Sequence, residues 1–219
     1  MKTALVIGAT GLVGKELVEQ LLGDARFGKV IVLVRRATGR SHPKLEEHLV
    51  DFNNPGSWRD LVRGDVLFSA MGTTIKKAGS QEAQYKIDYT YQYETARAAA
   101  ENGVPTYVLV SSAGANARSR IFYSRMKGEL EDAVKGLPFS QIRIIQPGIL
   151  AGDREEFRLG ERIGIGVMSV LGHVPGLTAY KPYHATVVAR SMINAALHGE
   201  GRVRTYKLKD VFRLAGGKV

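Results

Sequence analysis

The chain has 219 residues, of which 44% are hydrophobic and 24% are charged, and these values are ordinary for a globular protein of one domain. It has no cysteine, which excludes disulfides, thiolate nucleophiles and cysteine-ligated metals. The formal net charge of +10 comes from basic residues spread along the chain rather than from long blocks, so it does not by itself indicate a nucleic-acid partner.

The first segment, MKTALVIGATGLVG, could be read as a signal peptide with Lys2 as its basic end. Its glycines and the lack of a small-x-small cleavage site favour a buried strand followed by a turn instead. No apolar run approaches the ~18 residues of a membrane-spanning helix. We therefore expect a cytoplasmic protein without a membrane span.

Short apolar segments rich in Val and Ile alternate with segments of helical periodicity along most of the chain. The expected strands are residues 3–8, 29–34, 65–70, 106–112 and 140–146. The expected helices are residues 12–23, 80–102 and about 121–136. Alternation of this kind indicates βαβ units. The predicted fold class is therefore α/β, a Rossmann-type doubly wound parallel sheet.

The chain after these strands is less regular. It has a glycine-rich apolar stretch, a helical pattern at about 184–198 and a short strand near 203–208. There is no repeat or linker. We expect one domain over 1–219, with a core in 1–150 and a C-terminal extension, 151–219, packed on it.

The turn after the first strand reads GATGLVG and places Gly8, Gly11 and Gly14 three residues apart. Glycines here allow a pyrophosphate to lie against the backbone N–H groups at the start of the next helix, and Gly14 lets that helix approach the strand. The alternative is a tight strand–helix turn without a ligand. The preceding strand and the following amphipathic helix favour a dinucleotide site.

Arg35 and Arg36 follow the second strand, where a site for NAD usually has an acidic residue that binds the ribose 2′-hydroxyl. Guanidinium groups suit a 2′-phosphate and stack on adenine. The alternative is a pair of solvated arginines. The pattern favours NADP, with NAD less suited.

Two further contacts are expected from position alone, because ligands bind beyond the carboxyl ends of parallel strands. Asp51 follows a further strand, the third in chain order, which we expect between 29–34 and 65–70, and it could meet the adenine amino group. Met71 and Gly72 follow the fourth strand and would line the far side of the cofactor.

Ser111 and Ser112 end the fifth strand, and Tyr123 and Lys127 follow on the next helix, where positions i and i+4 share a face. A serine, a tyrosine and a lysine beside a nicotinamide can protonate a carbonyl oxygen while hydride adds to its carbon. The Lys127 ammonium would help the phenol exchange its proton near neutral pH. The alternative is an ordinary amphipathic helix with a half-buried tyrosine and a solvated lysine.

Six segments together resemble the short-chain dehydrogenase/reductase superfamily in its atypical branch. The most similar group is the small NADP-binding oxidoreductases that include the HIV Tat-interacting protein. The segments are GATGLVG, VRR, GTTIKKAGS, VLVSSAGA, YSRMKGELE and PGILAGDREEFRLGE. The resemblance runs from residue 4 to about 161 and implies an NAD(P)-binding Rossmann-fold domain.

The resemblance also implies roles for single residues. Tyr123 matches the proton donor and Lys127 the lysine that holds the nicotinamide ribose. The serine-to-tyrosine spacing is slightly short for the superfamily, which leaves open which of Ser111 and Ser112 is catalytic, with Ser112 favoured. Together with the residues argued from position, the expected cofactor-binding residues are Gly8, Thr10, Gly11, Leu12, Val13, Gly14, Arg35, Arg36, Asp51, Met71, Gly72, Ser111, Tyr123, Lys127, Leu150 and Arg158.

We therefore predict an NADP-dependent oxidoreductase that transfers a hydride between NADPH and a small carbonyl or related substrate, with Ser112, Tyr123 and Lys127 as catalytic residues. A second hypothesis is an NADP(H)-binding redox sensor that acts through protein partners without turnover. The chain has no zinc-finger spacing or RNA-binding signature, so no specific nucleic acid is expected. The five histidines lack ligand spacing, so no metal site is expected. A protein partner or homo-oligomer is left open.

Overall fold

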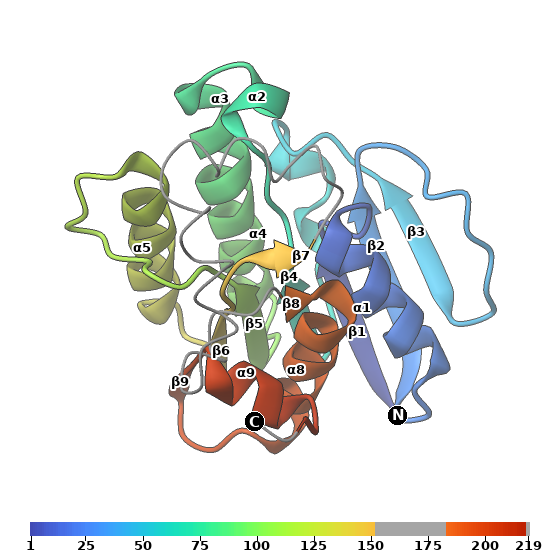
Figure 1. The fold of residues 1–219 in the computed structure, drawn as a ribbon. Helices are drawn as coiled ribbons and strands as arrows, with labels where there is room; N and C mark the ends of the chain where they lie inside the picture. Colours follow the sequence, from blue (N-terminus) through green and yellow to red (C-terminus); the bar gives the residue numbers. More distant parts are fainter. Residues whose placement is uncertain (152–182, 218–219) are drawn as a thin grey trace.

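The computed structural model describes residues 1–151 and 183–217. Seven strands form one parallel sheet in the order β3-β2-β1-β4-β5-β6-β9 (Figure 1). The strands are β1 (Lys2–Ile7), β2 (Phe27–Val34), β3 (Leu45–Leu49), β4 (Val66–Ser69), β5 (Thr106–Val110), β6 (Gln141–Gln146) and β9 (Val203–Lys207). The strand order reverses at β1 and β4, so the predicted doubly wound Rossmann-type sheet is confirmed.

The helices lie on both faces of this sheet. The longer ones are α1 (Leu12–Gly23), α4 (Tyr91–Glu101), α5 (Phe122–Lys135) and α8 (Ala185–His198). The shorter ones are η1 (Pro55–Ser57), η2 (Arg59–Leu61), α2 (Ile75–Ala78), α3 (Gln81–Tyr85), the π-helical turn η3 (Lys86–Thr90) and α9 (Lys209–Leu214). Strands β7 (Leu150–Ala151) and β8 (Tyr183–His184) pair in a small separate sheet.

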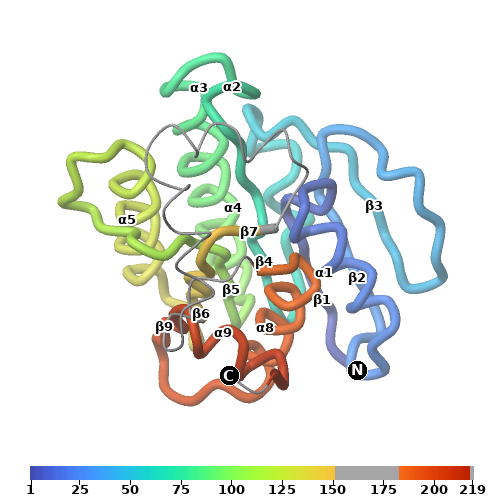
Figure 2. The backbone as a smooth tube through the Cα atoms, viewed as in Figure 1, coloured from blue at the N-terminus to red at the C-terminus, as the bar shows by residue number. Residues whose placement is uncertain are grey.

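Two hydrophobic cores form because successive side chains of a strand point to opposite faces of the sheet. In β1, Ala4 and Val6 pack in the core shared with α1 and α8, and Leu5 and Ile7 pack in the core shared with α4 and α5. Figure 2 shows the backbones of α1 and α8 side by side in front of the sheet. Burial on both faces explains why these strands are continuous apolar runs.

The strands and helices expected from the sequence are found with their ends within two residues of the predicted positions. The long helix expected over 80–102 is built from three consecutive parts, α3, η3 and α4, with the π-helical turn in the middle. The strand expected near 203–208 is β9, which adds to the edge of the main sheet beside β6. Among the described residues, no helix is both long and apolar enough to cross a membrane.

Arg143 of β6 is fully buried, and its guanidinium holds the chain that leads from α8 to β9. It donates hydrogen bonds to the carbonyl groups of Ala195 at 3.3 Å, Gly199 at 2.6 Å and Gly201 at 2.9 Å. A β-carbon at Gly199 would lie 2.2 Å from its Nε atom, so only glycine fits there. Burial lowers the pKa of Arg143, but the carbonyl groups at the end of α8 attract its charge.

Arg143→Met keeps an unbranched side chain but removes the donors to the carbonyl groups of Ala195, Gly199 and Gly201. We expect the free energy of unfolding in urea to fall by about 3 kcal/mol, since buried carbonyl groups lose their partners. Lys207→Met, which removes an exposed cation from β9, should change it by less than about 0.5 kcal/mol. Equal stability of the two variants would contradict this role.

Candidate functional site

A groove of about 120 Å³ lies beyond the carboxyl ends of β1, β2 and β4, at the point where the strand order reverses. Ligands of doubly wound sheets bind at this position. The groove is lined by Gly8, Ala9, Thr10, Gly11, Leu33, Val34, Arg35, Phe52, Ala70, Met71, Gly72 and Ile87.

The glycine turn forms one wall of the groove. Gly8 has a φ of +81°, and a β-carbon there would lie 2.5 Å from the backbone of Ala70. A β-carbon at Gly14 would lie 2.0 Å from the carbonyl oxygen of Gly8, so α1 packs directly on the turn. Gly11 is less constrained: its φ is −77°, and an added β-carbon would lie 3.2 Å from that oxygen, which a shift of a few tenths of an ångström relieves. Gly8 and Gly14 are therefore required by the fold, and Gly11 is the glycine free to serve a ligand.

The amino end of α1 opens toward this turn. Gly11 is its N-cap residue, no side chain caps the helix and the first turn holds no acidic residue. The free backbone N–H groups and the positive end of the helix dipole suit a phosphate group. Thr10 and Leu12 are exposed beside this end, whereas the Val13 side chain is buried in the core, which leaves its backbone for a ligand.

The adenosine end expected from the sequence is bounded by basic and aromatic side chains. Arg35 lines the groove and Arg36 is exposed next to it, and neither is paired with another described residue. Phe52, which the sequence analysis did not single out, lines the groove and stacks on Tyr91 with ring centroids 5.5 Å apart. These groups provide cationic and flat apolar contacts of the kind that a nucleotide uses.

The Asp51 carboxylate forms its hydrogen bonds within the loop that follows β3. Its carboxylate accepts hydrogen bonds from the backbone N–H of Asn53 at 2.9 Å and from the Asn53 amide at 2.8 Å. The backbone hydrogen bond lowers the pKa of Asp51. Asp51 is not among the residues that line the groove, whereas its neighbour Phe52 is.

Tyr123 and Lys127 lie together on α5, but their environments differ. Tyr123 is 41% exposed, whereas Lys127 is only 4% exposed, with its Nζ 5.8 Å from the centre of the Tyr123 ring. Lys127 also forms an ion pair of 3.1 Å with Asp88 of η3. Burial alone would lower the pKa of Lys127, but Tyr123 and Asp88 outweigh burial and raise it. The alternative of a solvated lysine is therefore wrong.

The two serines at the end of β5 are also in different environments. Ser111 is buried, and its hydroxyl donates to Glu131 of α5, which also accepts from Gln146 at 2.7 Å. Ser112 is half-buried, and its hydroxyl has only a long contact of 3.3 Å with the carbonyl group of Ala113. Ser112 therefore has the more available hydroxyl.

Two predicted residues belong to the C-terminal part of the expected site. Leu150 is the first residue of β7 and pairs with Tyr183 of β8. Arg158 lies outside the described residues. Among those that are described, no group of three histidine, aspartate or glutamate side chains could hold a metal ion.

Asp88 and its neighbours were missed by the sequence analysis, although a signal was present. Gln84, Asp88 and Gln92 recur every four residues in an otherwise Ala- and Tyr-rich helix, and all three are buried. Gln84 donates to the carbonyl group of Thr73 at 2.9 Å, and the Ser69 hydroxyl donates to Gln92 at 2.7 Å. This polar stripe, Gln84, Asp88 and Gln92, holds the loop after β4 that lines the groove.

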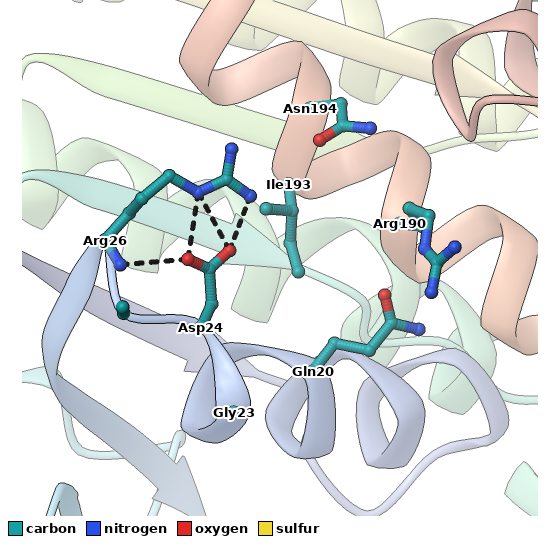
Figure 3. Close-up of a pocket in the computed structure, with 8 residues that line it drawn as sticks. Gln20, Gly23, Asp24, Arg26, Arg190, Ile193 and Asn194 are labelled. Atoms are coloured by element: carbon teal, nitrogen blue, oxygen red, sulfur yellow. Dashed lines mark hydrogen bonds and ion pairs between the residues drawn. The ribbon is translucent and has the colours of Figure 1, made fainter.

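A larger cavity, of about 520 Å³, lies at the other end of α1 (Figure 3). Gln20 and Gly23 of α1, Arg190 of α8 and the Asp24–Arg26 ion pair border it. Because Asp24 immediately follows α1 and precedes β2, this cavity opens at the amino edge of the sheet, and none of the predicted site residues lines it. The groove is therefore the candidate functional site.

Residues 8–137 match the model of a family described as NAD(P)H-binding. The chain belongs to this family. It is also 33% identical to the mitochondrial protein fmp52 of Aspergillus niger over the whole of both chains. The protein FMP52-1 of Scheffersomyces stipitis is 36% identical, with 97% of this chain and 98% of the relative covered. These relatives carry the name Fmp52 rather than that of the HIV Tat-interacting protein.

Solved structures support the fold. An oxidoreductase of the short-chain dehydrogenase/reductase family from Burkholderia thailandensis has a TM-score of 0.68 and 19% identity, with 93% of this chain and 90% of that chain covered. A short-chain dehydrogenase from Burkholderia cenocepacia in complex with NADP has a TM-score of 0.65 and 17% identity, with 93% and 87% covered. The enzyme WbmH of Bordetella bronchiseptica, in complex with NAD⁺, has a TM-score of 0.68 and 17% identity, with 94% and 75% covered. The predicted nucleotide-binding Rossmann fold is therefore confirmed.

The expectation of a cytoplasmic location is wrong, because the curated relatives are named mitochondrial proteins. That expectation was based on the lack of a signal-peptide cleavage site and of an apolar run long enough to span a membrane. Both features are equally compatible with a mitochondrial compartment, so composition could not decide between the two.

Gly11→Val places a branched side chain where the start of α1 would receive a diphosphate. We expect a folded protein whose affinity for NADPH, measured by fluorescence titration, is at least about tenfold weaker. Gly23→Val is the matched control at the other end of α1, where an added β-carbon meets no atom within 4 Å. If Gly11→Val bound NADPH as tightly as Gly23→Val, the turn would have only a structural role.

Proposed function

We propose that the protein is an NADP(H)-dependent oxidoreductase of the short-chain dehydrogenase/reductase type, which transfers a hydride between the nicotinamide and a small carbonyl or related substrate. The observation that carries the proposal is the buried Lys127, whose ammonium group lies 5.8 Å from the centre of the Tyr123 ring. Burying a lysine is costly, and a surface helix does not need it. The fold shared with short-chain dehydrogenases adds support.

The cofactor assignment is supported by the groove. The uncapped end of α1 and the glycine turn fit a diphosphate, and Phe52 offers a flat apolar surface. Arg35 and Arg36 are free to bind a 2′-phosphate, and no acidic residue follows β2 directly to bind a 2′-hydroxyl. We therefore propose NADP as the preferred cofactor.

The chemistry assigned to the side chains follows from their surroundings. Bound NADPH would supply the hydride. The exposed Tyr123 hydroxyl would donate a proton to the substrate oxygen, and the Lys127 ammonium would stabilise the phenolate that remains. The available Ser112 hydroxyl would hold the same oxygen by a hydrogen bond. Leu150 would contact the cofactor at the nicotinamide end, and Arg158, the other contact expected there, lies outside the described residues.

Replacing both Arg35 and Arg36 by Ala should weaken NADPH binding by about tenfold or more and leave NADH binding nearly unchanged, because the charge-assisted contacts are lost only from the 2′-phosphate. Fluorescence titration of the two cofactors measures both values. Replacing both Arg63 and Arg204 by Ala, which removes two exposed arginines that do not line the groove, is the control for the change in net charge. Equal affinity of the unmodified protein for NADPH and NADH would rule out the 2′-phosphate contact.

Tyr123→Phe keeps the ring but removes the hydroxyl that would exchange the proton. In a carbonyl-reduction screen with NADPH, we expect its turnover to be about 10²–10⁴-fold lower than that of the unmodified protein, with NADPH binding retained. Tyr93→Phe is the control, since Tyr93 is a half-buried tyrosine of α4 that stacks on Tyr89. Turnover that is indifferent to Tyr123→Phe would refute the catalytic role. NADPH binding with no turnover in the unmodified protein would instead favour the redox-sensor hypothesis.

A further inference from the structure

Asp88 and Lys127 form an ion pair in which both side chains are buried, with exposed fractions of 1% and 4%. In every other ion pair between described residues, at least one side chain is more than a third exposed. Removing two charges from water costs free energy that their mutual attraction only partly restores. Stability alone therefore does not explain why this pair lies beside the candidate site.

The Asp88 carboxylate has two acceptor oxygens, and each binds a different part of the site. Oδ1 lies 3.1 Å from the Lys127 ammonium on α5, and Oδ2 accepts the backbone N–H of Thr73 at 2.8 Å. Thr73 follows Gly72, which lines the groove, and a β-carbon at Gly72 would lie only 3.4 Å from Oδ1. One carboxylate thus joins the helix with the tyrosine–lysine pair to the loop at the cofactor groove.

Among the described residues, few charged groups lie close to the ion pair of Asp88 and Lys127. On α5, Lys127 faces the Tyr123 ring and is affected by the charge of Glu131, which is buried with Ser111. From η3, Asp88 is the acidic group in direct contact with it. Asp88 is therefore the acidic group that holds the lysine ammonium in place beside the Tyr123 ring.

We propose that Asp88 is a positioning residue of this site, which holds the Lys127 ammonium toward Tyr123 and the loop at Thr73 against the cofactor in one arrangement. This inference rests on the proposed function. An asparagine cannot replace Asp88, because Lys127 and the Thr73 N–H are both donors and an amide offers an acceptor on only one side. Two acceptors directed at two donors explain why a buried acid stands at this position.

A cycle of four proteins tests the proposal: the unmodified chain, Asp88→Asn, Lys127→Met and the double variant. NADPH dissociation constants are measured by fluorescence titration, which needs no substrate, and the thermal unfolding midpoint of each protein is recorded. Asp132→Asn is the charge-matched control, because it removes a carboxylate from an exposed ion pair with Lys135 on α5.

In the unmodified background, Asp88→Asn should weaken NADPH binding by about tenfold, because one of the two donors is left without an acceptor. In the Lys127→Met background, the same change should alter the affinity by less than about twofold, because the asparagine oxygen can then accept from Thr73. In the Lys127→Met background, Asp88→Asn should also raise the thermal unfolding midpoint, because it removes a buried carboxylate that has lost its lysine partner. Asp132→Asn should bind NADPH as the unmodified protein does.

Equal losses of affinity in both backgrounds, or no loss in either, would overturn the positioning role and leave the proposed function standing. Failure of the folded, unmodified chain to bind NADPH or NADH would instead overturn the proposed function, and this inference with it. If Asp88→Asn alone does not fold, the NADPH affinities of Lys127→Met and of the double variant are compared instead. A further loss of affinity in the double variant would then contradict the proposal, and an unchanged affinity would support it.

Discussion

The fold and the candidate site both depend on one close contact between backbone segments at the turn from β1 into α1. A β-carbon at Gly14 would lie 2.0 Å from the Gly8 carbonyl oxygen, and one at Gly8 would lie 2.5 Å from the backbone of Ala70. Glycine at both positions therefore lets α1 begin directly at the carboxyl edge of the sheet, beside the loop after β4. The uncapped helix end then borders the groove, where backbone N–H groups can receive a phosphate.

The opposite wall of the groove is positioned by hydrogen bonds rather than by close backbone packing. The polar stripe of Gln84, Asp88 and Gln92 binds Thr73 and Ser69, which flank the residues that line the groove. Buried polar groups must be paired, so Gln84 and Asp88 hold the loop at Thr73, and Gln92 holds the end of β4 at Ser69. Asp88 also binds Lys127, so the loop and the face of α5 that carries Tyr123 and Lys127 share a common support.

Much of this arrangement could be predicted from local pattern. Apolar runs and helical periodicity located the strands and helices, and the glycine spacing with Arg35, Met71 and Gly72 located the groove, because the carboxyl ends of neighbouring parallel strands meet at one edge. The pattern could not indicate that Phe52 faces the groove while Asp51 binds Asn53. The two are adjacent in the loop after β3, where no strand periodicity assigns a side chain to one face, and packing against Tyr91 decides the outcome.

The sequence by itself determined the α/β class, the order of the elements and the glycine turn between β1 and α1, because each of these depends on residues near one another in the chain. Only the tertiary structure decided that Lys127 is buried, that Ser111 is bound to Glu131 while Ser112 is available, and that Asp88 is paired with Lys127. These features arise between helices that are distant in sequence. The charge state and direction of a buried side chain depend on the partners that folding brings to it, and a single sequence does not specify which partners those are.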